Sequence, residues 1–210
     1  MTPAIVDLFF PIVGNTLPSD HGFALYSALT RVVPELHDAP WWGLHTVRGT
    51  RAGPGVLQLG RAAAAGLRLP SDRIGAVLPL AGRTLVVDGH RVALAPPTVH
   101  ALAPAPALSA RIVTVKGFLD PAPFANAVRR QLEEMEVAAS VELGTRKIVC
   151  VRDRKIVGYS VRIAGLADAR SILVQEHGIG GRRRFGCGLF RPSIRPLAVD
   201  RRPEPAADAE

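Results

Sequence analysis

The chain has 210 residues, of which 48% are hydrophobic and 21% charged, and its formal net charge is +8. This composition is that of a folded protein and excludes an intrinsically disordered one. No apolar run reaches the roughly 18–20 residues that a membrane span requires, and the first residues do not resemble a signal peptide, so we expect a cytoplasmic protein without membrane contact. The basic excess favours an acidic partner such as a nucleic acid, and a basic protein without such a partner is the alternative.

Cysteine and metal-ligand patterns are sparse. The two cysteines, Cys150 and Cys187, are too few for a disulfide framework or a zinc site, and we expect both to be small buried side chains. Aspartate and histidine occur as adjacent pairs, at residues 20–21 and 37–38, and not at the spacing of a ligand set. We therefore expect no metal and no other cofactor.

The first half of the chain combines apolar strand patterns with two helical ones. The helix after Asp20 has apolar side chains at helical spacing and ends at Pro34, which cannot continue it. Asp88 and Gly89 are the preferred pair for a tight hairpin turn. The pattern predicts the order βαββαβ plus a hairpin arm, an open sheet with two helices on one face. The expected strands cover 4–13, 44–48, 56–59 and 67–69, the helices about 20–33 and 72–80, and the hairpin 83–94.

The second half repeats this plan after a proline-rich stretch. Four prolines fall within residues 95–107, which predicts a semi-rigid spacer and a domain boundary. The expected strands then cover 108–116, 137–143, 147–151, 156–163 and 189–195, and the helices 121–136 and 166–177. The sequence therefore predicts an α+β chain with two βαββαβ modules in tandem. We expect domains over 1–95 and 108–198, a spacer over 96–107, and a disordered polar tail over 199–210.

A glycine-rich loop lies before the last expected strand. Residues 178–188 hold five glycines, three consecutive arginines and one phenylalanine. Glycines permit left-handed backbone and close approach to a ligand, and arginines bind phosphate, so the loop is suited to a polyanion. In an extended loop Arg182 and Arg184 would share one side and Arg183 the other, while Phe185 would join the core or stack on a base. The alternative is a simple connection with a solvated basic face.

Two nucleotide-binding motifs do not fit this loop. Gly181 and Gly186 have the spacing of the Walker pattern, but Cys187 and Gly188 stand where lysine and serine or threonine are required. The dinucleotide pattern fails because Arg183 occupies its third glycine position. Nucleoside triphosphates and NAD are therefore poor candidates for the ligand.

Three stretches resemble one family. Residues 178–192, with the sequence Gly-Ile-Gly-Gly-Arg-Arg-Arg-Phe-Gly-Cys-Gly-Leu-Phe-Arg-Pro, resemble the terminal glycine-rich loop of the CRISPR repeat-processing endoribonucleases. Residues 17–29 and 109–117 resemble the compact type I branch of these proteins, which belong to the repeat-associated mysterious protein superfamily. The resemblance implies tandem ferredoxin-like (RRM-like) modules. It also implies cleavage of precursor CRISPR RNA within repeats, leaving a 2′,3′-cyclic phosphate and a 5′-OH, retention on the repeat stem-loop, and entry into a type I surveillance complex.

Histidines are the candidates for metal-free RNA cleavage. RNA supplies its own nucleophile, the 2′-OH, so the enzyme needs only in-line positioning, proton transfer and charge stabilisation. Histidine suits proton transfer because its ordinary pKa lies near neutrality. The resemblance places the catalytic histidine at or just after the first helix, in a segment of the type Leu36-His37-Asp38. We therefore expect His37 as the general acid–base, with a solvated loop histidine as the alternative, and His45 and His21 as partner acid or orienters of substrate.

The residue that assists the catalytic histidine is left open between three candidates. Some members of the family use a tyrosine or lysine beside the histidine, but this chain has no lysine before Lys116. Arg48, His45 or Tyr26 would have to fill that role. The expected RNA contacts are Gly180, Gly181, Arg182, Arg183, Arg184, Phe185, Arg48 and Lys116.

Two other functions stay open. One is a non-catalytic subunit of a CRISPR effector complex that binds repeat RNA. The other is an unrelated two-module enzyme that binds a small phosphorylated ligand in a discrete pocket and has no affinity for RNA.

Overall fold

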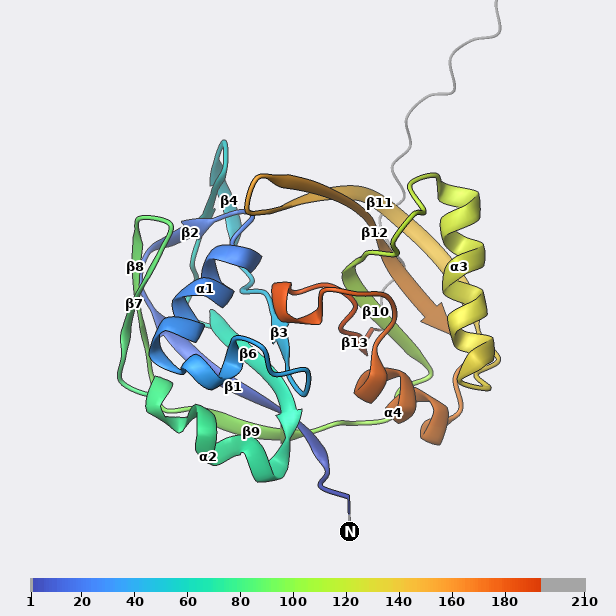
Figure 1. Ribbon diagram of the computed structural model, residues 1–210, viewed down its shortest axis with the longest axis horizontal. Coiled ribbons are helices and arrows are strands. Elements are labelled where there is room, and N and C mark those ends of the chain that lie inside the picture. The colour runs from blue at the N-terminus through green and yellow to red at the C-terminus, as the bar shows by residue number, and fades with distance from the viewer. Residues whose placement is uncertain (1, 194–210) are drawn as a thin grey trace, which may run out of the picture.

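The structure is a computed structural model that describes residues 2–193 (Figure 1). The strands are β1 (Ile5–Val13), β2 (Thr16–Pro18), β3 (Gly43–His45), β4 (Thr50–Gly53), β5 (Val56–Gln58), β6 (Ala64–Pro70), β7 (Thr84–Val87), β8 (His90–Leu94), β9 (Thr98–Ala101), β10 (Ala107–Val113), β11 (Ser140–Val151), β12 (Arg154–Ala164) and β13 (Arg191–Pro192). The α-helices are α1 (Gly22–Val32), α2 (Ile74–Val77), α3 (Pro121–Glu134) and α4 (Asp168–His177). The 3-10 turns are η1 (Pro34–Leu36), η2 (Ser71–Arg73), η3 (Leu78–Leu80) and η4 (Arg183–Phe185).

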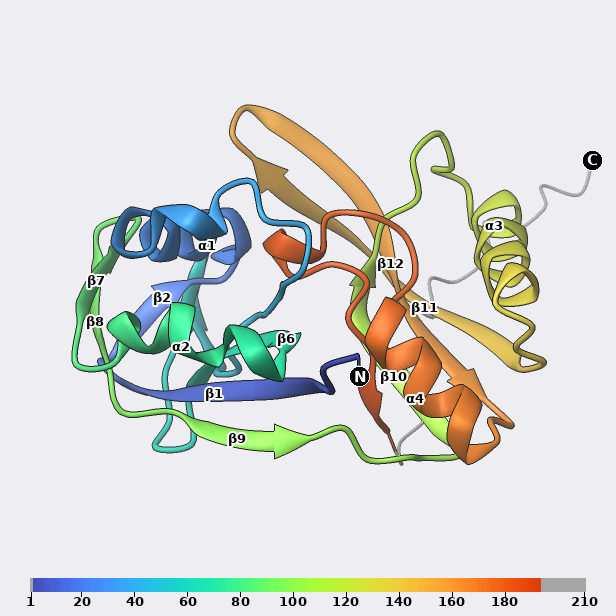
Figure 2. The same cartoon turned by 60° about the horizontal axis from the view of Figure 1, so that its bottom comes forward.

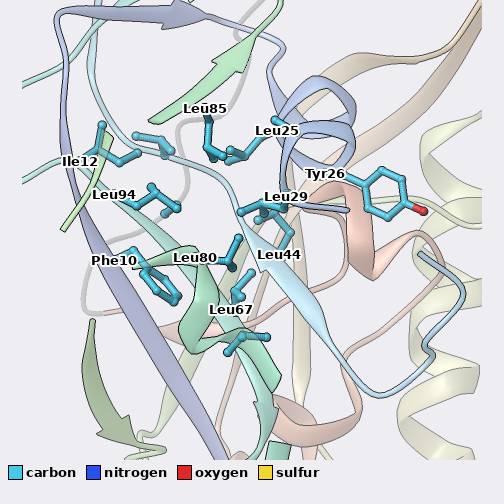
Figure 3. Close-up of a cluster of buried hydrophobic side chains, with 14 of the residues drawn as sticks. Phe10, Ile12, Leu25, Tyr26, Leu29, Leu44, Leu67, Leu80, Leu85 and Leu94 are labelled. Carbon is cyan, nitrogen blue, oxygen red and sulfur yellow. The ribbon is translucent and has the colours of Figure 1, made fainter. Parts of the chain in front are cut away.

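The first module is built around β1. Its sheet has the order β3-β6-β1-β8-β7, and β9 also pairs with β1. Leu8, Phe10 and Ile12 recur at every second position of β1 and join the same buried cluster as Leu25 and Leu29 of α1 (Figure 3). A separate small sheet, with the order β2-β5-β4, lies near the N-terminal end of α1.

Two predictions for this module are wrong in detail. The expected helix over 72–80 is a single α-helical turn between two 3-10 turns. Gly75 weakens this segment and Pro79 has no N–H group with which to continue it. The expected spacer over 96–107 contains a strand, because Val99 and its neighbours in β9 pair antiparallel with β1 along its edge. Figure 2 shows β9 beside β1 before the chain crosses to the second module.

The predicted hairpin turn is confirmed. Asp88 and Gly89 connect β7 to β8, and both have positive φ, 47° and 82°. A two-residue turn of this kind needs left-handed backbone at both central positions, which aspartate and glycine tolerate.

The second module is a four-stranded sheet with the order β11-β12-β10-β13 and helices α3 and α4. The strands expected over 137–143 and 147–151 form one long strand, β11, with a register irregularity between Leu143 and Arg146. Strands β11 and β12 form a hairpin that reaches over the first module (Figure 1). There the backbone N–H of Cys150 donates to Asp20 Oδ2 at 2.6 Å. Cys150 is exposed, contrary to expectation, whereas Cys187 is buried as predicted.

Both modules share one strand order, which confirms the tandem ferredoxin-like fold class. In each, the first strand lies between the third and the fourth, and the second strand lies outside the third. The buried apolar side chains form two clusters, one within residues 6–94 and one within 108–190. The closing strand expected over 189–195 is short: β13 covers only Arg191–Pro192 among the described residues 189–193. Residues 194–195 and the tail over 199–210 lie outside the described residues. No helix within residues 2–193 is long and apolar enough to cross a bilayer.

Candidate active site

The glycine-rich loop leaves α4, passes β10 and reaches α1 of the first module (Figures 1 and 2). It is not an extended segment. Arg183–Phe185 form the 3-10 turn η4, between Arg182 and Gly186 in left-handed conformation. The turn is closed by its own backbone, since the N–H of Phe185 donates to the carbonyl of Arg182 at 2.9 Å.

Glycines allow this loop to lie directly against both modules. A Cβ on Gly180, whose φ is +76°, would lie 2.4 Å from the carbonyl oxygen of Thr114, next to β10. A Cβ on Gly22 of α1 would lie 2.3 Å from the carbonyl oxygen of Phe185. Neither approach is possible for a residue with a side chain. The glycines therefore serve the packing of the loop between the modules.

The same packing uses the backbone N–H groups of two glycines that were expected to contact RNA. The N–H of Gly180 donates to Gln131 Oε1 at 2.8 Å, and the N–H of Gly181 donates to the carbonyl of Thr114 at 3.0 Å. These two amides are thus occupied within the protein, so the predicted RNA contact of both glycines cannot use them.

Phe185 anchors the loop on α1. Its ring meets those of Phe23 and Tyr26 edge-on, with centroid separations of 5.6 Å and 4.9 Å. Of the two possibilities for Phe185, core or base stacking, the structure shows packing against the first core.

The three arginines of the loop separate as expected, although the loop is not extended. Arg182 and Arg184 line the cleft described next. Arg183 turns toward α4 and donates to the carbonyl of Glu176 at 2.8 Å, a favourable place for a cation at a helix C-terminus. Burial lowers the pKa of Arg183, and nearby Arg68 adds to this effect. The predicted RNA contact of Arg183 is therefore replaced by a contact with the protein.

A cleft of about 650 Å³ lies between α1, the η4 loop and the tip of the β11–β12 hairpin. Its lining is predominantly basic, with two arginines from the loop and two from the hairpin tip. The carboxylates in the lining are Asp38 and Asp153. The charged lining residues are Arg182, Arg184, Arg152, Arg154, Asp38 and Asp153, together with His37.

His37 lies in this cleft with its side chain 58% exposed. Its Nδ1 is 3.1 Å from Asp38 Oδ1, which leaves Nε2 for a ligand. Its backbone carbonyl accepts hydrogen bonds from Tyr26 and Arg184. An imidazole oriented by a carboxylate and surrounded by arginines can move a proton beside a bound phosphate.

His21 is placed elsewhere, in the core. Its side chain is fully buried, and both ring nitrogens are used: Nδ1 donates to the carbonyl of Pro18 at 2.8 Å and Nε2 accepts the N–H of Val47 at 2.9 Å. Burial lowers the pKa of His21. The predicted role in proton transfer does not fit this position, because neither nitrogen can reach a substrate.

His45 belongs to a buried charge network that joins the modules. Its Nε2 is 2.8 Å from Asp7 Oδ1, and Arg68 donates to both oxygens of the same carboxylate at 2.8 Å. Arg68 also donates to the carbonyls of Gln175 and Phe190 in the second module. Burial lowers the pKa of His45, opposed by Asp7. The three histidines thus do not converge on one edge, and only His37 faces the cleft.

Burial alone would raise the pKa of Asp7. The hydrogen bonds from Arg68 and His45 outweigh burial and hold the pKa of Asp7 well below its usual range. The carboxyl is therefore ionised at neutral pH. Although the network is buried, Asp7 and His45 each border a hollow between the modules.

The remaining predicted contacts, Arg48 and Lys116, are exposed and lie outside the cleft. Arg48 lines a second hollow of about 650 Å³ at the junction of the modules, together with Phe9, His100 and Arg191. Arg48 and Arg191 also border a neighbouring cavity of about 320 Å³. Lys116 follows β10.

Sequence reasoning missed two features of the site. Arg152 and Arg154 were assigned no role, although the length of the β11–β12 hairpin brings them to the cleft. The Asp7–Arg68 pair was also missed. The sequence does contain a sign of this pair, because each of the two strands is otherwise apolar and holds one charged residue. A charged residue in such a strand indicates a buried partner of opposite charge. Within the described part of the chain, no group of three or more histidine, cysteine or acidic side chains could hold a metal.

Comparisons with known proteins agree with this arrangement. A protein of Myxococcus xanthus (strain DK1622) named CRISPR-associated endonuclease Cas6 is 42% identical over 194 residues, which cover 92% of this chain and 84% of that protein. The structure of a Cas6-related gene product from Pyrococcus furiosus has a TM-score of 0.68 at 14% identity, covering 92% of this chain and 100% of the other. Thermus thermophilus Cse3 bound to an RNA representing a pre-cleavage complex has a TM-score of 0.53 at 15% identity, with coverages of 92% and 100%.

The two solved structures agree in fold. The family described as Cas6 Crispr matches residues 6–195, which is nearly the whole chain and includes both modules and the glycine-rich loop. Together with the relative from Myxococcus xanthus, this match confirms the resemblance drawn from the sequence: the chain belongs to the Cas6 family of CRISPR-associated endoribonucleases.

Proposed function

We propose that this protein cleaves precursor CRISPR RNA within its repeats without a metal ion. The observation that carries the proposal is the position of His37, an exposed imidazole at a carboxylate in a cleft lined by four arginines. A phosphate held by these arginines would lie beside a group that can accept and donate protons.

The chemistry needs few parts. The 2′-OH of the nucleotide before the cut attacks the phosphorus, its proton passes to a base, and the bond from phosphorus to the 5′-oxygen breaks as that oxygen gains a proton. The products are a 2′,3′-cyclic phosphate and a 5′-OH. His37, as the general acid–base, takes the 2′-OH proton on Nε2 and returns a proton from the same atom to the 5′-oxygen, so that the imidazole ends the step unchanged. Arg182, Arg152 and Arg154 stabilise the charge that builds on the phosphate oxygens.

The protein then stays on the repeat stem-loop and enters a type I surveillance complex in the cytoplasm. The basic hairpin tip and the η4 loop give it two elements, from one module, with which to hold the RNA after cleavage.

The test is cleavage of labelled repeat RNA in EDTA under single-turnover conditions. The wild type should cut at one position and leave a 2′,3′-cyclic end. His37→Ala should lower the rate by roughly 10²- to 10⁴-fold with RNA affinity retained. His100→Ala, at an exposed histidine of β9 outside the cleft, is the matched control.

Three results would contradict the proposal in different ways. Cleavage that requires Mg²⁺ would exclude the metal-free mechanism, and an active His37→Ala variant would remove His37 from it. Binding without any cleavage would favour the alternative function, a repeat-RNA-binding subunit of an effector complex.

A further inference from the structure

The segment that carries His37 has little regular structure of its own. It follows η1 and contains the exposed residues Asp38 and Pro40 before the chain enters β3. The indole of Trp42 donates to the carbonyl of Leu36 at 2.9 Å and so fixes the residue before His37. The position of His37 itself must be set by other side chains.

Two side chains donate to the same atom, the carbonyl oxygen of His37. One is the hydroxyl of Tyr26 on α1, at 2.8 Å. The other is the guanidinium of Arg184 in η4, which crosses from the second module. A carbonyl oxygen has two lone pairs, so both are filled, and the bond from arginine is charge-assisted.

Tyr26 is itself held in place. Its ring stacks on Trp42 at 6.0 Å with an interplanar angle of 10°, and it also makes the edge contact with Phe185. The Arg184 guanidinium carbon lies 5.9 Å from the centroid of the Tyr26 ring. Figure 3 shows the Tyr26 hydroxyl at the margin of the first core, directed away from the cluster.

We infer that Tyr26 and Arg184 are positioning residues for His37, and that the second module places the imidazole of the first through Arg184. This inference rests on the proposed function. Arg182 and Arg184 line the same cleft, and both were predicted to contact RNA. The inference separates them, because it assigns Arg184 to the positioning of His37. It also assigns the Tyr26 hydroxyl to the protein backbone and not to the reacting phosphate.

The test separates cleavage from binding. Tyr26→Phe removes one hydroxyl and keeps the ring contacts, and Arg184→Ala removes the second donor. At saturating enzyme, each should lower the single-turnover cleavage rate by roughly 10- to 100-fold, the effect expected when a reacting group is misplaced by about 1 Å. The RNA Kd of Tyr26→Phe should change less than about threefold, and Arg184→Lys should cleave faster than Arg184→Ala because it restores a cationic donor.

Matched controls exist for both substitutions. Tyr159→Phe also deletes a phenol that donates to a backbone carbonyl, that of Leu119 at 2.7 Å, but it lies in the second module outside the cleft. Arg31→Ala deletes an exposed arginine of α1 whose hydrogen bonds, among residues 2–193, go to Ser27 of the same helix. Both controls should cleave bound RNA at the wild-type rate, even if Tyr159→Phe lowers the melting temperature as much as Tyr26→Phe does.

Two further measurements decide what kind of role Tyr26 has. The pH profile of the residual rate in Tyr26→Phe should keep the wild-type shape, since every titrating group of the reaction is still present. Hydrogen exchange of the backbone over residues 34–42 should be faster in both variants, a readout that does not depend on cleavage. A pH profile that loses one limb, or wild-type cleavage rates in both variants while His37→Ala is inactive, would overturn the inference and leave the proposed function intact.

Discussion

The guanidinium of Arg68, on β6 of the first module, donates a 2.6 Å hydrogen bond to the carbonyl oxygen of Gln175, on α4 of the second. Arg68 is 1% exposed and also donates to the carbonyl of Phe190 and to both oxygens of Asp7. Gln175 and Phe190 flank the glycine-rich loop along the chain, so this one side chain binds the backbone on both sides of the loop. Arg68 therefore fixes the loop relative to the first module.

Replacing Arg68 by methionine should cost about 3–5 kcal/mol of unfolding free energy, because Asp7 would be left buried without its main counter-charge. Urea denaturation followed by circular dichroism measures this decrease. The pair Asp7→Leu with Arg68→Met should recover part of it, since both charges are then absent. Arg91→Met, at an exposed position of β8, should change stability by no more than about 0.5 kcal/mol.

Adjacent glycines of the loop should respond very differently to alanine. Gly180→Ala places a Cβ 2.4 Å from the carbonyl oxygen of Thr114 at a φ of +76°, and should cost roughly 2 kcal/mol or more. Gly181→Ala meets nothing within 4 Å and should be nearly neutral. Thermal unfolding of both variants is the measurement. Equal melting temperatures would show that the loop is not packed on β10.

Stability should fall as the pH is lowered through the ordinary range of histidine. Burial lowers the pKa of His21 and His45, so at mildly acidic pH the unfolded chain binds more protons than the folded one. The unfolding free energy is then fully present above about pH 6.5 and decreases below it, by at most ~1.4 kcal/mol per pH unit for each histidine. Urea unfolding at pH 5, 6, 7 and 8 tests this.

The His21→Gln variant isolates one of the two contributions. It keeps a donor and an acceptor for Pro18 and Val47 but cannot titrate. Its stability should depend less steeply on pH than that of the wild type. A wild-type stability that is constant from pH 5 to 8 would mean that both histidines are as accessible to protons in the folded chain as in the unfolded one.

The hairpin tip should contribute to the salt dependence of RNA binding. Replacing Arg152 and Arg154 by glutamine should weaken binding to repeat RNA and reduce the slope of log K against log salt by roughly 0.7–0.9 for each phosphate that these arginines neutralise. Titrations from 50 to 300 mM salt give the slope. Arg129→Gln, on the exposed face of α3, should leave it unchanged. Identical slopes for the hairpin variant and the wild type would place the RNA elsewhere.

Much of the fold follows from local patterns in the sequence. The alternation in β1, the apolar spacing of α1 and the Asp88-Gly89 turn each depend on neighbouring residues only, and each was predicted in place. The family resemblance also follows from local motifs, above all the loop over 178–192, and the family match confirms it. The assignment of His37 as the catalytic residue stays a prediction, carried by the motif around it and supported by its place in the cleft.

Tertiary structure decided what those motifs do. The buried position of His21 depends on Val47, and that of His45 on Asp7, partners that are distant in sequence. The sequence by itself therefore could not tell these two histidines from His37. Gly180, Gly181 and all three arginines of the loop were expected to contact RNA. Instead, Thr114, Gln131 and Glu176 accept hydrogen bonds from part of these groups, and the backbone of the loop closes η4 as a turn. A buried polar group must find a partner wherever the chain brings one, and that pairing is fixed by long-range packing rather than by local sequence.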